Sequence, residues 1–147
     1  MAAVPPRYLI VPDKSVGPIS IGENTGPVIG AIGRPGRLGP DAGPEWIYGA
    51  LQVDVNSEGL SVVALEVVAQ YGATQAEAAR YETASGIHVG STVGEVEKAY
   101  RAARCSLHNK GCALTNSDGR ATYFDVASHL SKLSSSTPIV AIFISGP

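Results

Sequence analysis

Two aspartates occupy matching places in two short apolar segments of the chain. Asp54 lies within Val53–Val55, and Asp125 lies within Phe124–Val126. Two carboxylates that converge on one site can act as the general acid and the general base of a reaction. In a strand whose faces alternate, each aspartate is equally the outward neighbour of two residues that face the core. The sequence leaves both interpretations open.

His88 is a further candidate acid–base group, because an imidazole titrates near neutral pH. It alternates with Ile87 and Val89, so in a strand it points away from the face that these two residues bury. A histidine in that position either faces solvent without a chemical role or serves as a general base in a cleft.

The motifs of several catalytic and binding classes are missing from the sequence. Gly33–Gly39 is basic and rich in glycine, but it lacks the spacing of a P-loop and of a dinucleotide-binding turn. Gly90–Gly94 does not have the spacing of a nucleophile elbow, and Ser91–Thr92 suits the start of a helix instead. No two histidines have the spacing of metal ligands. We therefore expect neither a metal site nor a cofactor.

The two cysteines, Cys105 and Cys112, enclose six residues that include Gly111. This spacing favours a small disulfide loop, because the glycine lets the chain bend back on itself. Free thiols are one alternative, and a metal site in which His108 joins the cysteines is another. The metal alternative supplies three ligands, whereas structural zinc takes four.

The composition bounds the class of protein. The chain has 147 residues, of which 44% are apolar and 16% are charged, and this suits one domain over residues 1–147. Its 17 glycines and 10 prolines predict many turns and short elements rather than a helical bundle. The formal net charge of −2 excludes a general nucleic-acid binder, whose surface is basic.

The longest apolar run, Ile139–Ile144, is too short to cross a bilayer, so no transmembrane segment is expected. The amino-terminal residues lack the basic and apolar regions of a secretory signal. The chain is then either cytoplasmic or the mature form of an exported protein. The cysteine pair and the low charge content favour the exterior of the cell or its envelope, with the cytoplasm as the alternative.

An internal similarity organises the chain. Gly17–Ile32 aligns without gaps on Ser85–Tyr100, and apolar residues and glycines coincide along the alignment. The segments around the two aspartates also correspond, after a short insertion in the second copy. We infer two tandem repeats over approximately residues 17–70 and 85–146.

Each repeat is predicted to hold a short strand, a helix and a hairpin. In the second repeat, Thr92 and Glu95 form a capping box, and Asn24 is the expected cap of the first helix. We expect an α+β fold in which one antiparallel sheet carries the helices on one face. Tyr8–Val11 is expected to add a strand, and Gln75–Tyr81 to form a helical turn between the repeats.

The start of the second helix, Gly90–Val96, follows the alternating strand residues Ile87–Val89 and has the sequence Gly-Ser-Thr-Val-Gly-Glu-Val. This plan resembles a superfamily that includes small outer-membrane assembly lipoproteins and secreted β-lactamase inhibitory proteins, in which a helical segment and a β-meander occur singly or in tandem. The chain departs from it in having one helix per repeat where the inhibitors have two, and in lacking a lipidation cysteine near its amino terminus. The resemblance implies an envelope or secreted binding role without catalysis.

The aromatic residues and the loops suggest where a partner would bind. In the first hairpin, the alternation of residues 47–55 places Trp46 and Tyr48 on the polar face, beside Gln52 and Asp54. Tryptophan and tyrosine dominate binding hot spots. The loops at residues 34–45 and 104–119 add further candidates, namely Arg34, Arg37 and His108.

The sequence is compatible with three functions. The first is an exported, non-catalytic module that binds a protein or an envelope component. The second is a small enzyme of the hydrolase or isomerase type, with His88, Asp54 or Asp125 as the acid–base group in a pocket between the repeats. The third is a structural homodimer that pairs open sheet edges.

Overall fold

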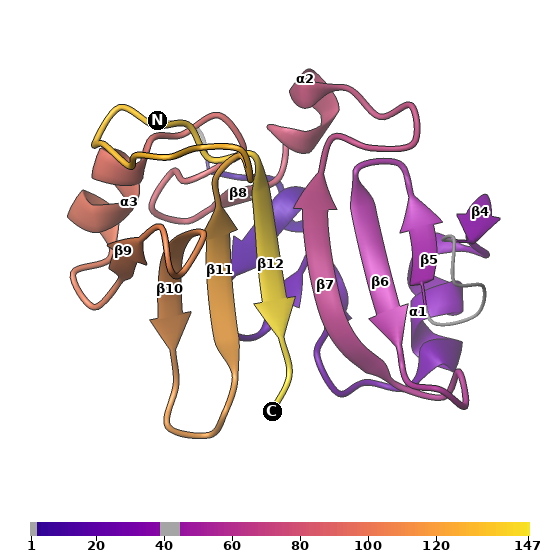
Figure 1. The fold of residues 1–147 in the computed structure, drawn as a ribbon. Coiled ribbons are helices and arrows are strands. Elements are labelled where there is room, and N and C mark those ends of the chain that lie inside the picture. Colours follow the sequence, from indigo (N-terminus) through magenta and orange to yellow (C-terminus); the bar gives the residue numbers. More distant parts are fainter. Residues whose placement is uncertain (1–2, 39–44) are drawn as a thin grey trace.

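The structure, a computed structural model, describes residues 3–38 and 45–147. Its larger layer is an antiparallel sheet of eight strands (Figure 1). From one edge to the other these strands are β4 (Arg37–Leu38), β5 (Glu45–Tyr48), β6 (Leu51–Val55), β7 (Val62–Val68), β12 (Ala141–Ser145), β11 (Ala121–Asp125), β10 (Gly111–Thr115) and β9 (Arg104–Ser106).

A second layer lies behind this sheet in the view of Figure 1. It contains a small sheet of β3 (Ile19–Ser20), β2 (Ser15–Val16), β1 (Leu9–Val11) and β8 (Glu82–Thr83), in which β1 and β8 are parallel. The remaining elements of the described residues are the 3₁₀ helix η1 (Pro6–Tyr8) and the helices α1 (Thr25–Ile32), α2 (Gln75–Ala78) and α3 (Val93–Ala99).

The fold is α+β, as expected, with helices packed against sheet. The expectation of a single sheet covered by two helices was wrong. The amino-terminal strand β1 belongs to the small second sheet and not to the eight-stranded sheet. The cause lies in the chain after β1. Tight turns fold β1, β2 and β3 into a meander, and their buried residues Ile10, Val16 and Ile19 complete the core from the second layer.

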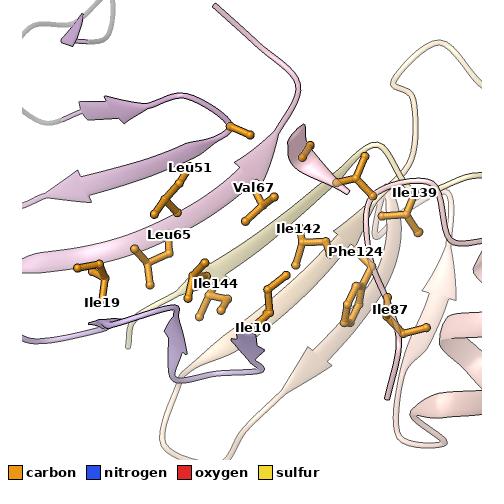
Figure 2. Close-up of a cluster of buried hydrophobic side chains, with 14 of the residues drawn as sticks. Ile10, Ile19, Leu51, Leu65, Val67, Ile87, Phe124, Ile139, Ile142 and Ile144 are labelled. Carbon is orange, nitrogen blue, oxygen red and sulfur yellow. The ribbon is translucent and has the colours of Figure 1, made fainter. Parts of the chain in front are cut away.

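The core fills the space between the two layers (Figure 2). Isoleucine, valine and leucine dominate it, and Phe124 is its largest fully buried side chain. Leu65 and Ile142 reach it from the central strands, while Ile10 and Ile19 reach it from the small sheet (Figure 2). Burial of this kind stabilises a domain by about 25 cal/mol per Å² of apolar surface removed from water.

The helices predicted after Asn24 and after Thr92 are both present, as α1 and α3. The Thr92 side chain accepts a hydrogen bond from the Glu95 amide, and the Glu95 carboxylate accepts one from the Thr92 amide, which completes the capping box of α3. The predicted turn after residue 74 is α2, capped by Thr74. Asn24 stands at the cap position of α1, but its side chain makes no capping hydrogen bond.

The prediction about the first hairpin was wrong in one respect that matters for function. Gly49 and Ala50 form a two-residue turn, so that Tyr48 pairs with Leu51. This turn reverses the alternation assumed from a continuous strand. Trp46 therefore pairs with Val53 on the face of the sheet that packs against the core. The side chains of Trp46 and Tyr48 are partly buried and contact that core.

The predicted disulfide is present, but its setting differs from the loop that was expected. Cys105 and Cys112 are directly opposite each other on β9 and β10, with their Cα atoms 4.0 Å apart. Much of the segment 104–119 is thus strand rather than loop, and the bond fastens the outermost strand of the sheet. At the opposite edge of the sheet, the position equivalent to the disulfide is occupied by Leu38 of β4 paired with Trp46 of β5.

The two halves of the large sheet have matching registers about their central pair, β7 and β12. In one half Val53 pairs with Leu65, and in the other Phe124 pairs with Ile142. From the centre outward, each half adds its strands in the reverse of their order along the chain. The strands of the two halves therefore occupy equivalent places on either side of the centre.

The turns that lead into α1 and α3 make matching contacts as well. The Gly22 amide donates to the carbonyl of Val62 at 2.8 Å, and the Gly90 amide donates to the carbonyl of Ile139 at 2.9 Å. Both glycines have positive φ, 89° and 103°, a conformation that glycine adopts at little cost. Each of these two turns is thereby hydrogen-bonded to the chain at the start of one of the two central strands, β7 or β12.

Removal of the disulfide is expected to destabilise the protein by about 2–3 kcal/mol, because the bond restrains the unfolded chain over a short loop. The test is urea unfolding of the Cys105→Ser, Cys112→Ser double variant beside the parent. The parent in reductant is the control and should lose stability similarly. An unfolding midpoint that reductant leaves unchanged would contradict the bond.

Candidate functional site

The eight-stranded sheet has a second face, on the side away from the core, which we call the open face. Among the residues that the structure describes, no helix or second sheet lies in front of its central strands in Figure 1. One row of directly paired residues crosses all eight strands on this face: Arg37, Ile47, Gln52, Glu66, Phe143, Tyr123, Ala113 and Arg104. An acid and an aromatic residue thus meet at the centre of the sheet, with an arginine at each end.

Glu66 is the central charged group of the open face. Burial among its neighbours is the main cause that raises the pKa of its carboxyl to about 7, and the charges of Asp125, Asp54 and Glu45 raise it further. The Phe143 ring lies opposite it on β12. Glu66 therefore titrates near neutral pH, far above an ordinary glutamate.

Asp54 and Asp125, the two aspartates singled out by sequence, lie on this same face. Burial raises the pKa of Asp125 to about 6, partly offset by the charge of Lys110. Burial also raises the pKa of Asp54, and a hydrogen bond from the Gln52 amide, 2.7 Å long, works in the opposite direction. The structure brings both aspartates within electrostatic reach of Glu66.

Aromatic and small side chains surround these acids. The rings of Tyr123 and Phe143 lie 6.3 Å apart and are tilted by 36°. Ala64, Ala121 and Ala141 flank the central row and are almost completely buried. These small side chains leave the surface beside the aromatic rings low. A side chain of a binding partner could therefore contact an aromatic ring and a carboxylate at the same time.

The half of the open face formed by β4–β7 is partly covered by neighbouring residues of the chain. Gln70, in the turn after β7, donates a hydrogen bond of 2.7 Å to the Gln52 side chain. The Arg37 guanidinium lies 4.6 Å from the centre of the Tyr71 ring. The uncovered part is therefore centred on Glu66, Phe143, and Tyr123.

The structure separates His88 from the two aspartates. The backbone of His88 forms an isolated antiparallel β-bridge with that of Glu82 in the second layer. The side chain of His88 is half-buried, and its Nδ1 atom lies 2.7 Å from the Val89 carbonyl oxygen. The expected alternation is present, since Ile87 and Val89 are buried. An acid–base site that combines His88 with Asp54 or Asp125 is thus not formed.

The other residues considered for binding lie in separate places. Arg34 is exposed just after α1, and Arg37 is exposed on β4 at one edge of the large sheet. His108 is exposed in the turn between β9 and β10 at the opposite edge. Residues 39–44 of the first candidate loop lie outside the described residues.

Glu66 was missed by the sequence analysis. Its signal is present, since it is a lone acid in the apolar run Val62–Val68. Its significance depends on strand pairing, which places it between Gln52 and Phe143 and near acids that are distant in sequence. Within residues 3–38 and 45–147, no group of three or more histidine, cysteine, aspartate or glutamate side chains is arranged to hold a metal ion.

The raised pKa of Glu66 predicts a pH-dependent stability. The folded state holds the Glu66 proton up to about pH 7, whereas an unfolded glutamate releases it near pH 4.3. The folded state thus binds more protons in this window, and the free energy of unfolding should fall as the pH rises through it. We expect Glu66→Gln to stabilise the protein by about 1 kcal/mol at pH 8, after allowance for solvent screening.

The measurement is urea unfolding of the parent and of Glu66→Gln at pH 5 and pH 8. The exposed Glu97 on α3 supplies a matched control, because Glu97→Gln removes the same charge outside the site. Equal pH dependence in the parent and in Glu66→Gln would show that Glu66 ionises normally.

No protein-family model matches the sequence, and no curated protein matches it. Among solved structures, the chain is similar to an extracellular protein containing a SCP domain from Bacillus anthracis, with a TM-score of 0.43 and 12% identity. The similarity covers 86% of this chain and 44% of that one. No helix among the described residues is long and apolar enough to cross a membrane.

Proposed function

We propose that the protein is a non-catalytic binding module that holds a basic segment of a protein partner on its open face. The observation that carries the proposal is the group of acids around Glu66 on the uncovered face of the sheet. Three neighbouring acids raise the pKa of Glu66 by their charge, so together they form a strongly negative region. A positive side chain placed there would relieve this repulsion.

The chemistry of the face indicates what kind of residue it fits. Lysine and arginine combine a positive end with an apolar stem. The carboxylates of Glu66 and Asp125 suit the charge, and the rings of Phe143 and Tyr123 suit the stem. Arg37 and Arg104 at the ends of the central row would repel a uniformly basic chain. A short segment with a few positive residues over the sheet centre fits best.

We also propose that the chain contains two copies of one module. The matching registers of the half-sheets and the matching corner hydrogen bonds of Gly22 and Gly90 support this. Each copy would then comprise one helix and a four-stranded meander: α1 with β4–β7, and α3 with β9–β12. The duplicated arrangement would join two meanders into one wide face for binding.

That arrangement also supports the relation to the superfamily of small outer-membrane assembly lipoproteins and secreted β-lactamase inhibitory proteins. A helical segment followed by a meander, used twice, is the plan which that resemblance implies. We infer that the protein acts outside the cell or in its envelope. The Cys105–Cys112 disulfide favours this location, because such bonds persist in oxidising compartments.

The proposal is tested with a defined peptide, acetylated and amidated, that carries two lysines on either side of a phenylalanine. Binding of the peptide is followed by changes in the amide chemical shifts of the protein at low salt and pH 8. The shifts should centre on β6, β7, β11 and β12. Binding should weaken about tenfold in the Glu66→Gln, Asp125→Asn double variant, since two attractive charges are removed.

Binding should also weaken at pH 5.5, where Glu66 and Asp125, with pKa values of about 7 and about 6, are largely neutral. A peptide with glutamates in place of the lysines is the control ligand, and Glu97→Gln is the control variant. Equal binding of the acidic peptide, or shifts centred on the small sheet, would refute the proposal.

A further inference from the structure

A pocket of about 370 Å³ opens on the other side of the large sheet, where η1, α1 and the first half of the sheet meet. Its walls include three tyrosines, Tyr8, Tyr48 and Tyr81, together with the side chain of Arg7. These residues belong to segments far apart in sequence, and none of them lies on the open face. The volume is near the lower end of small-molecule sites, which span about 300–1,000 Å³.

We propose that this pocket binds a small aromatic carboxylic acid with one ring. The argument begins with its apolar surface, which Ile32 of α1 and Leu51 of β6 supply. The rings of Tyr8 and Tyr81 meet edge to face, with their centres 5.2 Å apart and their planes at 84°. Aromatic pairs in this geometry offer both ring faces and ring edges to a further ring.

The polar groups of the pocket favour a negative ligand. The Arg7 guanidinium carbon lies 4.9 Å from the centre of the Tyr8 ring. Among the described residues, no carboxylate lies within salt-bridge distance of Arg7. Burial, and to a lesser extent Tyr8, raises the pKa of Tyr81. The charges of Arg7 and Arg80 act in the opposite direction, which places two positive groups near the Tyr81 hydroxyl. A guanidinium in this setting binds a carboxylate through parallel N–H donors.

The three tyrosine hydroxyls have different roles. The Tyr48 hydroxyl already donates to the Gly33 carbonyl at 2.9 Å, so it fixes the wall of the pocket against the end of α1. In the part of the chain that the structure describes, the Tyr8 and Tyr81 hydroxyls donate to no protein acceptor. They can therefore donate to a carboxylate held by Arg7.

The backbone that carries Arg7 is held in place by close packing. A Cβ atom at Gly17 would stand 2.5 Å from the Arg7 carbonyl oxygen, and Gly17 has a φ of +57°. The Gly17 amide donates to the carbonyl of Leu9 at 2.8 Å. The segment before β1 is thus anchored on the turn between β2 and β3, and this fixes the backbone of Arg7, whose side chain lines the pocket.

The test is titration with phenylacetate at low salt and pH 7.5, followed by amide chemical shifts. Shifts are expected at η1, at the end of α1 and around Tyr81. Phenylacetamide, which has the same ring without the charge, should bind about tenfold more weakly, because its neutral amide cannot accept two parallel charge-assisted hydrogen bonds from the Arg7 guanidinium. Equal binding of the two compounds, or shifts elsewhere, would overturn the proposal.

Three variants sharpen the result. Arg7→Gln should weaken phenylacetate binding about tenfold, whereas Arg37→Gln should leave it within about twofold. Arg37 is a matched control because it too lies over a tyrosine ring, that of Tyr71, but outside the pocket. Ala31→Phe fills the pocket from an exposed position of α1 and should abolish binding without loss of folding.

The outcomes separate the pocket from the open face. Glu66→Gln should not change phenylacetate binding, and Arg7→Gln should not change binding of the basic peptide. Equal losses in Arg7→Gln and Arg37→Gln would overturn the assignment to the pocket. Tighter binding of a peptide that ends in phenylalanine than of phenylacetate would overturn the assignment to a free acid.

Discussion

The antiparallel pairing of β7 with β12 is the constraint on which the rest of the structure depends. Five residue pairs join these strands, from Ala141 with Val68 to Ser145 with Ala64. Every other strand of the large sheet is added outward from this pair. On one face the pair contributes Leu65 and Ile142 to the core, and on the other it carries Glu66 opposite Phe143. A slip by one residue would move a carboxylate into the core, so the register is strongly specified.

The acids of the open face show a conflict between stability and charge. A carboxyl whose pKa is raised to about 7, like that of Glu66, is ionised at a cost to the folded state. Asp54 and Asp125 add to that cost by their charge. Groups held in an unfavourable electrostatic setting are typical of functional sites, where stability is exchanged for affinity or chemistry. The functional interpretation therefore rests on the open face and not on the half-buried His88 of the second layer.

Local signals in the sequence were sufficient to predict α3, because the capping box of Thr92 and Glu95 lies within one helical turn. They were also sufficient to pair Cys105 with Cys112 across a short distance. The placement of Trp46 and Tyr48 failed because a two-residue turn at Gly49 reverses the alternation of side chains. Glycine in an apolar run was the warning sign.

The acidic site and the tyrosine pocket could not be predicted for a different reason. Glu66 acquires its neighbours through pairings between strands distant in sequence, and Tyr8, Tyr48 and Tyr81 converge through the second layer. Alternation within one strand says which residues share a face, but not which strand lies beside it. Both sites therefore required the three-dimensional structure.

The two edges of the large sheet are secured by different means, and this makes them unequal. At one edge a covalent bond between Cys105 and Cys112 ties the last strand to its neighbour. At the equivalent place on the other edge, Leu38 faces Trp46, and about half of the leucine surface is exposed. Local unfolding of the sheet should therefore begin at β4, whereas the disulfide should prevent β9 from separating. Thermal fluctuations should thus be larger at the β4 edge than at the β9 edge.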